Sequence, residues 1–84
     1  MEVSLHRLKL LRELARRGTV TAVASALNYT VSAVSQQLAL LEREVGTSLF
    51  ERRGRGIVLT EAGRLLAMHS DRILAAVDEA GHAM

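Results

Sequence analysis

Apolar side chains recur at helical spacing in four segments of the chain. In the first, from about Ser4 to Arg17, leucines recur every three or four residues and charged side chains fill the positions between them. The stripe that this spacing predicts to face the core is Leu5, Leu8, Leu11, Leu14 and Ala15. The side expected to face away from the core carries His6, Arg7, Lys9, Arg12, Glu13, Arg16 and Arg17. Gly18 supplies the expected C-terminal stop of this helix.

A second, shorter helix is expected to follow Thr19, whose hydroxyl is of the type that caps helix N-termini. Its apolar positions follow the i, i+3, i+4, i+7 pattern and are Val20, Val23, Ala24 and Leu27. Asn28 and Tyr29 interrupt the pattern, and Thr30 is placed to cap the next helix. A short helix, a tight turn and a longer helix form the outline of a helix-turn-helix, although many helical hairpins share that outline.

The third segment, Thr30 to Leu41, is uncharged in a chain of which 24% of the residues are charged. As a helix that runs to about Val45 and ends at Gly46, it carries one apolar stripe of Val34, Leu38, Leu41 and Val45. A separate stripe of small or amide side chains is formed by Ser32, Ser35, Gln36 and Ala39. Such a slim polar face can enter a DNA groove and hydrogen-bond to bases. An ordinary amphipathic helix could show the same pattern, so this segment alone leaves both interpretations open.

The pattern changes from Phe50 to Leu59, where two short strand-like arms flank the residues Arg53-Gly54-Arg55-Gly56. The glycines permit the positive φ angles of a tight hairpin. A charged turn is often no more than a solvated loop. Because this one directly follows a candidate recognition helix, we favour a wing whose arginines contact DNA phosphates or the minor groove.

Thr60 is expected to cap a long final helix from Glu61 to about Ala80, with a frayed end over 81–84. The apolar stripe of this helix is Ala62, Leu65, Leu66, His69, Ile73, Ala76, Val77 and Ala80. So short a chain has no other segment free to cover the outer half of the stripe, and a second copy in a two-fold dimer is the simplest cover. Folding back entirely onto its own domain fits the first turns better than the last. The expected dimerisation residues are Leu65, Leu66, His69, Ile73 and Val77.

Composition favours one small, mainly α-helical domain. The 84 residues are 49% apolar, with Tyr29 and Phe50 as the aromatic residues and with no proline, so we expect a modest core of Leu, Val and Ala between helices. The expected division is a winged helix-turn-helix over 1–59 and a dimerisation helix over 60–80. The chain has no cysteine and three scattered histidines, which argues against a metal site or a cofactor. No catalytic constellation can be assembled from the sequence, so an enzyme is not expected.

The charge of the chain is weak overall but locally concentrated. The net charge is +2, Lys9 is the only lysine among eleven basic residues, and Arg52, Arg53 and Arg55 form a cluster. The planar guanidinium of arginine suits phosphate groups and base edges, which indicates one docking surface on a nucleic acid. The sequence shows neither the run of about 18 apolar residues that spans a membrane nor a signal peptide, so we expect a cytoplasmic location.

Several short motifs occur together in a fixed order. They are Ala33-Val34-Ser35 with Gln37-Leu38, then Leu41-Glu42, Leu49-Phe50-Glu51-Arg52 and Leu59-Thr60-Glu61-Ala62-Gly63. In this order the chain resembles, from Leu5 to Ala80, the N-terminal DNA-binding domain of bacterial LysR-type transcriptional regulators. The resemblance implies a winged helix-turn-helix and a linker helix that pairs antiparallel with its counterpart in a dimer. It further implies dimers or tetramers on partly palindromic promoter DNA. Members of the family normally continue into a larger C-terminal domain that binds a small-molecule inducer, so this chain is either an excised DNA-binding domain or an unusually short member, and we favour excision.

The resemblance also implies which residues meet DNA. The base-contacting positions correspond to Val31, Ser32, Ser35 and Gln36. Phosphates would be held by Thr21 and Thr30 at helix N-termini. The wing would contribute Arg52 and Arg53, with Arg55 at its tip.

Two positions depart from the pattern of the family. Val31 stands where most members have glutamine, and a valine can only touch a thymine methyl group. Val20 stands where most members have phenylalanine and should only soften the packing. Sequence preference would therefore depend on Ser32, Ser35, Gln36 and the shape of the DNA.

A different class of function also fits part of the pattern. A helical module that dimerises, binds proteins and never touches DNA would explain the apolar last helix and the modest net charge. It does not explain the arginine-tipped turn.

Overall fold

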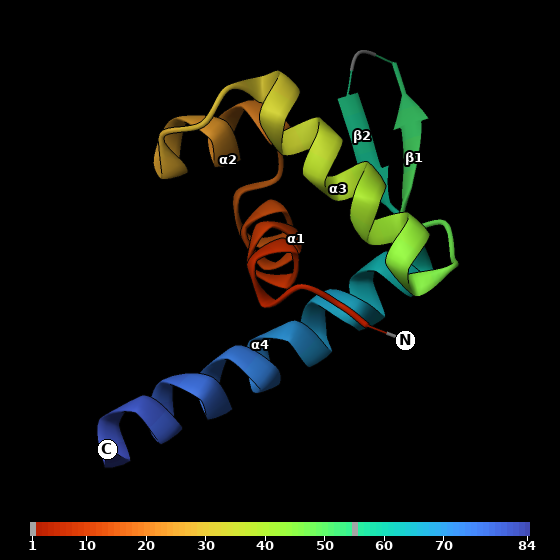
Figure 1. Ribbon diagram of the computed structural model, residues 1–84. Helices are drawn as coiled ribbons and strands as arrows, with labels where there is room; N and C mark the ends of the chain where they lie inside the picture. The colour runs from red at the N-terminus through yellow and green to blue at the C-terminus, as the bar shows by residue number, and fades with distance from the viewer. Residues whose placement is uncertain (1, 55) are drawn as a thin grey trace.

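The computed structural model describes residues 2–54 and 56–84, which form four helices and one small sheet. In chain order the elements are α1 (Leu5–Arg17), α2 (Val20–Leu27), α3 (Val31–Val45), β1 (Phe50–Arg53), β2 (Gly56–Leu59) and α4 (Glu61–Ala83). The first three helices pack together, and the hairpin of β1 and β2 stands beside α3 (Figure 1). Helix α4 starts below the hairpin, passes α1 and continues beyond the rest of the fold. None of the helices described is both long enough and apolar enough to cross a membrane.

The ends of the helices are set by local hydrogen bonds. Each helix starts after a residue whose hydroxyl accepts a hydrogen bond from a backbone N–H three positions later, and these caps are Ser4, Thr19, Thr30 and Thr60. Helices α1 and α3 end at glycines in the left-handed conformation, Gly18 and Gly46. Asn28 ends α2 in the same conformation, with φ of 60°. The predicted positions of α2 and α3 are confirmed residue by residue.

Helix α4 differs from the prediction at its end. It continues to Ala83, three residues beyond Ala80, so residues 81–83 are helical rather than frayed. Gly81 is not among the glycines with positive φ, and the region contains no proline. Because neither device that commonly stops a helix acts there, the backbone hydrogen bonds continue to the end of the chain.

The core lies between α1, α2, α3 and the first turns of α4. Its buried residues are Leu8, Leu10, Leu11, Leu14, Val23, Ala24, Val34, Leu38, Leu41, Leu49 and Ala67. The predicted stripe of α3 is confirmed, with Val45 partly buried at its lower end. Val20 and Leu27 of α2 are also partly buried against this core, as their spacing predicts.

The prediction for α1 is wrong at several positions. Leu5 is 46% exposed and Ala15 is exposed, whereas Leu10, which the stripe omitted, is 1% exposed. Glu13 was expected to face away from the core but is only 6% exposed. The reason is that α1 contacts α2, α3 and α4, so more of its circumference is covered than a single stripe provides.

The predicted hairpin is confirmed. Strands β1 and β2 pair antiparallel, with Phe50 opposite Leu59 and Arg52 opposite Ile57. Residues directly opposite each other share a face of the sheet. The face that carries these two pairs is turned toward the core, and Phe50, Ile57 and Leu59 pack partly buried against it. The other face carries Glu51, Arg53 and Val58, all exposed. The turn contains Gly54 with φ of 59°, and Arg55 lies outside the described residues.

Candidate nucleic-acid interface

The outer face of α3 carries the predicted reading stripe. Ser32, Ser35, Gln36 and Ala39 are all exposed. The opposite face of the same helix is anchored in the core through Val34, Leu38 and Leu41. Rigid anchoring on one face and short polar side chains on the other allow a helix to enter the major groove of DNA, which is about 12 Å wide.

A groove brings together predicted DNA-contacting residues from three elements. It has a volume of about 470 Å³ and lies between the start of α2, the start of α3 and the hairpin. The predicted residues that line it are Thr21, Val31, Ser35 and Arg52. Residues that are far apart in the sequence therefore lie on one continuous surface.

Of the other predicted residues that the structure describes, Thr30, Ser32, Gln36 and Arg53 do not line this groove. Ser32 and Gln36 are exposed on the outer face of α3. The hydroxyl oxygen of Thr30 accepts a hydrogen bond from the N–H of Ala33 at 3.0 Å, which leaves the hydroxyl proton free to be donated. Arg53 is exposed and its Nη2 lies 3.8 Å from Oε2 of Glu51, a loose surface pair.

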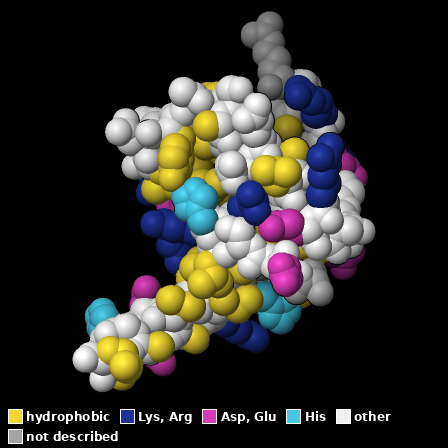
Figure 2. Space-filling view, viewed as in Figure 1, with side chains coloured by type: hydrophobic (Ala, Val, Ile, Leu, Met, Phe, Trp, Pro, Cys, Tyr) yellow, Lys and Arg dark blue, Asp and Glu magenta, His cyan; other side chains and the backbone are white. Residues whose placement is uncertain are grey.

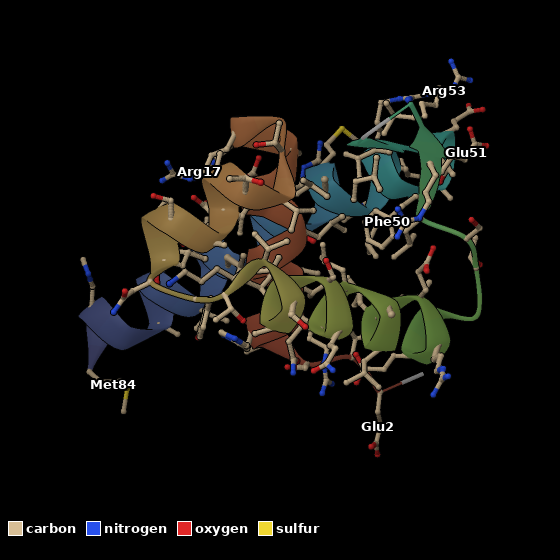
Figure 3. The ribbon with its side chains drawn as sticks, turned by 90° about the horizontal axis from the view of Figure 1, so that it is seen from above. Glu2, Arg17, Phe50, Glu51, Arg53 and Met84 are labelled. Carbon is tan, nitrogen blue, oxygen red and sulfur yellow. The ribbon has the colours of Figure 1, made fainter. Side chains whose placement is uncertain are left out.

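The side chains of the hairpin divide between its two faces. In Figure 3, Glu51 and Arg53 point outward at the far end of the hairpin, whereas Phe50 lies nearer its base. Arg52 shares the face of Ile57 and lines the groove beside Ser35. The two arginines of β1 therefore point in different directions: Arg52 points toward α3 and Arg53 points away from it.

Arg43 is a further candidate that the sequence prediction missed. It is exposed and lies four residues after Ala39 and seven after Gln36, so it continues the reading stripe at helical spacing. The spacing alone was sufficient to find it. An exposed arginine at this end of α3 suits a DNA phosphate.

Side chains of α1 hold α3 in place. Arg7 donates from Nε to Oε1 of Gln37 at 2.9 Å and from Nη1 to Oε2 of Glu44 at 2.8 Å. The hydroxyl of Tyr29, just before α3, lies 3.2 Å from Nε2 of His6. Arg7 and His6 were expected to face away from the core, but both link α1 to the helix-turn-helix. The orientation of the reading stripe is thus fixed by polar contacts as well as by the core.

The outer half of α4 is uncovered. The first half of α4 packs on the domain through Gly63, Ala67 and Ser70. In the second half, every residue from Ala75 to Met84 is exposed. Of the predicted dimerisation residues, Leu65, Ile73 and Val77 are 53%, 39% and 45% exposed, and His69 is also exposed. Leu66 differs, because it is partly buried against the core. In Figure 2, hydrophobic side chains gather along the part of α4 that extends from the domain.

Comparison with known proteins establishes the family. The family model described as a bacterial regulatory helix-turn-helix protein of the lysR family matches residues 5–64. The chain belongs to this family.

Regulators of transcription are among the relatives of this lysR-family chain. It is 40% identical over 81 residues to a probable RuBisCO transcriptional regulator of Cyanophora paradoxa, covering 96% of this chain and 25% of that protein. It is 45% identical over 73 residues to the RuBisCO operon transcriptional regulator of Allochromatium vinosum, covering 87% of this chain and 24% of that one. The chain thus spans about a quarter of the length of these curated relatives. They are regulators, not enzymes.

Solved structures of the family share this fold. The CbnR_DBD–DNA complex superposes with a TM-score of 0.90 at 31% identity, covering 96% of this chain and 93% of that one. The complex of BenM_DBD with catB site 1 DNA superposes with a TM-score of 0.89 at 25% identity, covering 96% and 91%. The fold is therefore a winged helix-turn-helix with a following helix. These likenesses support DNA binding over the alternative of a dimerising module that never touches DNA.

Proposed function

We propose that this lysR-family domain reads promoter DNA by placing α3 in the major groove. The observation that carries the proposal is the exposed stripe of α3 beside the groove that Thr21, Ser35 and Arg52 line. Ser32, Ser35 and Gln36 offer hydroxyl and amide groups to base edges, and Val31 offers a methyl contact to thymine. The sequence preference depends mainly on Ser32, Ser35, Gln36 and the shape of the DNA.

Phosphate contacts set the position of α3 on the duplex. Thr21 and Thr30 lie in or next to the first turn of a helix, where backbone N–H groups and hydroxyls attract phosphate. Arg52 and Arg53 bind the backbone from the wing, and Arg55 extends this contact at its tip. Arg43 reaches a further phosphate from the other end of α3. Such contacts contribute affinity but carry no direct sequence information.

A dimer presents two copies of α3 to one face of the DNA. The surface of α4 that carries Leu65, His69, Ile73 and Val77, together with the exposed part of Leu66, pairs antiparallel with the same surface of a second copy. A two-fold dimer matches a partly palindromic site, and two dimers can form a tetramer. In this arrangement residues 1–59 form the DNA-binding unit and the helix that follows is the dimerisation linker.

The whole protein is a cytoplasmic regulator that responds to a small molecule. The relatives are longer than this chain by about three times its length, because the chain covers 25% and 24% of them. That additional region is large enough to hold an inducer-binding domain.

The test of base recognition compares Gln36→Ala on two DNA molecules. A cognate duplex is first selected from a random pool, and binding is then measured on it and on a duplex of scrambled sequence. Gln36→Ala is expected to cost about 1 to 3 kcal/mol on the cognate duplex and little on the scrambled one, because a base contact is lost but no phosphate contact is. Equal losses on both duplexes would remove Gln36 from base recognition.

Gln37→Ala is the matched control. Gln37 is the neighbouring residue of the same type, but its Oε1 accepts from Arg7 of α1. Its removal should lower the stability of the domain and should change binding to both duplexes by a similar factor.

A further inference from the structure

Glu42 links the end of the recognition helix to the start of the wing. Its Oε2 accepts a hydrogen bond from the N–H of Leu49 at 2.8 Å and a second, longer one from the N–H of Phe50 at 3.3 Å. Phe50 is the first residue of β1. One carboxylate of α3 therefore holds the two backbone N–H groups at which the hairpin begins. Hydrogen bonds to a charged acceptor such as this carboxylate are stronger than those between neutral groups.

The same segment is tied to α4 from the other side. The carbonyl oxygen of Leu49 accepts a hydrogen bond from the N–H of Thr60 at 2.9 Å. The hydroxyl of Thr60 donates to the carbonyl oxygen of Ser48 at 2.8 Å and accepts from the N–H of Gly63 at 3.0 Å. The segment 48–50 is thus a junction between α3, the hairpin and α4, and Glu42 is the side chain of α3 that enters it.

The hairpin needs such an anchor because it has little stability of its own. It consists of two strands of four residues each, and isolated two-stranded hairpins are at best marginally stable. Only one face packs on the core, through Phe50 and Leu59 at its base and through Ile57 one residue pair from its turn. The exposed outer face, with Glu51, Arg53 and Val58, contributes nothing to its placement.

A small change in the tilt of the hairpin at its base produces a large displacement of its tip. Four residues of strand extend about 13 Å, so a tilt of about 15° at the base would move the tip by about 3 Å. That displacement exceeds the range over which an arginine–phosphate hydrogen bond persists. The position of Arg53 relative to α3 therefore depends on how firmly the start of β1 is held.

We propose that Glu42 is a positioning residue that keeps the wing in register with the recognition helix, so that Arg53 meets a phosphate while α3 reads bases. The inference rests on the proposed function, in particular on the phosphate contact of Arg53. Glu42 itself touches no DNA. It acts through the backbone of Leu49 and Phe50.

The test is a double-mutant cycle of Glu42→Ala and Arg53→Ala. Binding of each variant to a 30-base-pair duplex of scrambled sequence is measured at two salt concentrations. In the wild-type background, Arg53→Ala should weaken binding about five- to tenfold and reduce the salt slope by about one unit, as expected for one lost phosphate contact. In the Glu42→Ala background, the same change should weaken binding by about twofold or less, because coupled residues are not additive.

Two controls separate positioning from charge and from folding. Glu42→Gln retains an acceptor oxygen and should restore most of the Arg53 effect. Glu44→Ala removes the same charge from the same helix, but Glu44 pairs with Arg7 of α1, so this variant should leave the Arg53 effect intact. Amide hydrogen exchange at Leu49 and Phe50 should speed up in Glu42→Ala and not in Glu44→Ala. If Glu42→Ala does not fold, the cycle is run with Glu42→Asp, whose shorter side chain withdraws the carboxylate.

The outcomes distinguish this inference from the proposed function. An equal Arg53 effect in the wild-type and Glu42→Ala backgrounds overturns the positioning role and leaves the DNA contact standing. The positioning role is also overturned, and the DNA contact left standing, if Glu44→Ala removes the Arg53 effect as completely as Glu42→Ala does, or if Glu42→Gln fails to restore that effect. An absent Arg53 effect in the wild-type background overturns the phosphate contact and the positioning role together.

Discussion

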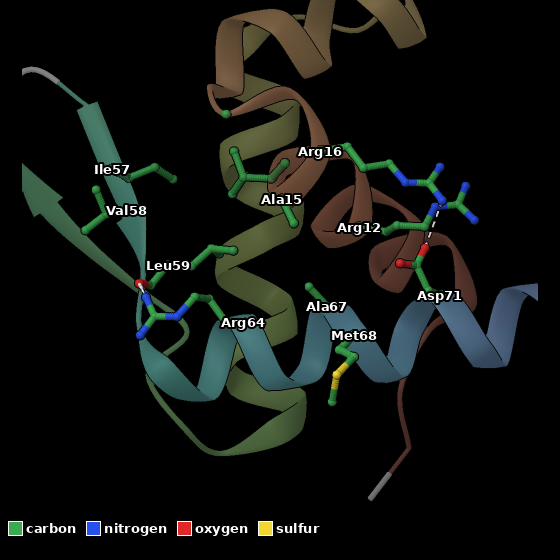
Figure 4. A pocket seen from close by; sticks show the side chains of 12 residues that line it. Arg12, Ala15, Arg16, Ile57, Val58, Leu59, Arg64, Ala67, Met68 and Asp71 are labelled. Carbon is green, nitrogen blue, oxygen red and sulfur yellow. Dashed lines mark hydrogen bonds and ion pairs between the residues drawn. The ribbon is translucent and has the colours of Figure 1, made fainter.

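At the scale of single residues, charged side chains of α1 form a fixed cluster around a buried carboxylate. Glu13 lies 3.0 Å from Nε of Arg17, 3.3 Å from Nε of Arg12 and 3.4 Å from Nη1 of Arg16. Arg16 reaches on to Oδ1 of Asp71 at 2.9 Å and so connects α1 to α4, at the rim of a groove between α1, β2 and α4 (Figure 4). Burial alone would raise the pKa of Glu13, but the hydrogen bond from Arg17 and the charge of Arg12 outweigh it and hold the pKa below its usual value of 4.5.

Glu13→Gln should therefore destabilise the domain in a pH-dependent way. Because the pKa of Glu13 is lower in the folded chain than in the unfolded chain, its stabilisation is complete above pH 4.5 and is lost as the pH falls through the folded value. Arg16 and Arg17 are partly exposed, so we expect the variant to lose only about 1 to 2 kcal/mol of unfolding free energy near neutral pH. Urea unfolding measured from about pH 7 down to about pH 3 should show the difference shrinking toward zero. A difference independent of pH would exclude the ionised carboxylate as its source.

At the scale of elements, the angle between the hairpin and α4 depends on one glycine. A side chain at Gly63 would overlap the carbonyl oxygen of Leu49. The first turn of α4 can therefore lie against the start of the wing only because this position has no Cβ. The close approach lets Thr60 complete its hydrogen bonds to the segment 48–50.

Gly63→Ala and Gly81→Ala should have opposite effects on stability, although both lie in α4. At Gly63 the methyl group must push α4 away from Leu49, which should cost about 1 to 3 kcal/mol. At Gly81 nothing lies within 4 Å of the added Cβ. The change there should stabilise the helix by up to about 1 kcal/mol, because alanine has the higher helix propensity. Thermal unfolding of the two variants measures this difference, and stabilisation by both would mean that α4 does not need the close approach.

At the scale of the whole molecule, the fold is elongated because α4 extends beyond the other helices and the hairpin (Figure 1). The principal extents are 45 × 27 × 18 Å, and the 23 residues of α4 alone span about 35 Å. The domain covers the first half of this helix and leaves apolar side chains of the second half in water. A long uncovered apolar face of this kind is what a second copy would bury.

Ile73→Glu should split the proposed dimer. The variant places a charge in the centre of the exposed apolar stripe, where pairing would bury it without a partner, so the dimer dissociation constant should rise about 100-fold or more. Sedimentation velocity over a range of concentrations measures this change. Ala75→Glu is the matched control, since Ala75 is equally part of the projecting helix but lies on its opposite side. A dimer that survives Ile73→Glu would place the dimer interface elsewhere.

The sequence by itself determined the elements and their order, because the signals for them are local. The hydroxyls of Thr19, Thr30 and Thr60 bond to backbone groups three residues later, and Gly18 and Gly46 adopt the left-handed conformation that ends a helix. The spacing of Val34, Leu38 and Leu41 likewise determined which face of α3 is anchored and which is exposed. The motif order was sufficient to identify the family, since the lysR-family match spans residues 5–64.

Only the tertiary structure decided which polar side chains hold these elements together. Glu13 and Arg7 both occupy positions of α1 that helical spacing assigns to the outside, yet one is buried and the other binds α3. Glu42 meets its partners seven and eight residues away, beyond the end of its own helix. Leu66 belongs to the apolar stripe of α4 but is partly buried in the core. Periodicity describes one helix in isolation, whereas these contacts depend on how closely a second element approaches, and that distance is set by the packing of the whole domain.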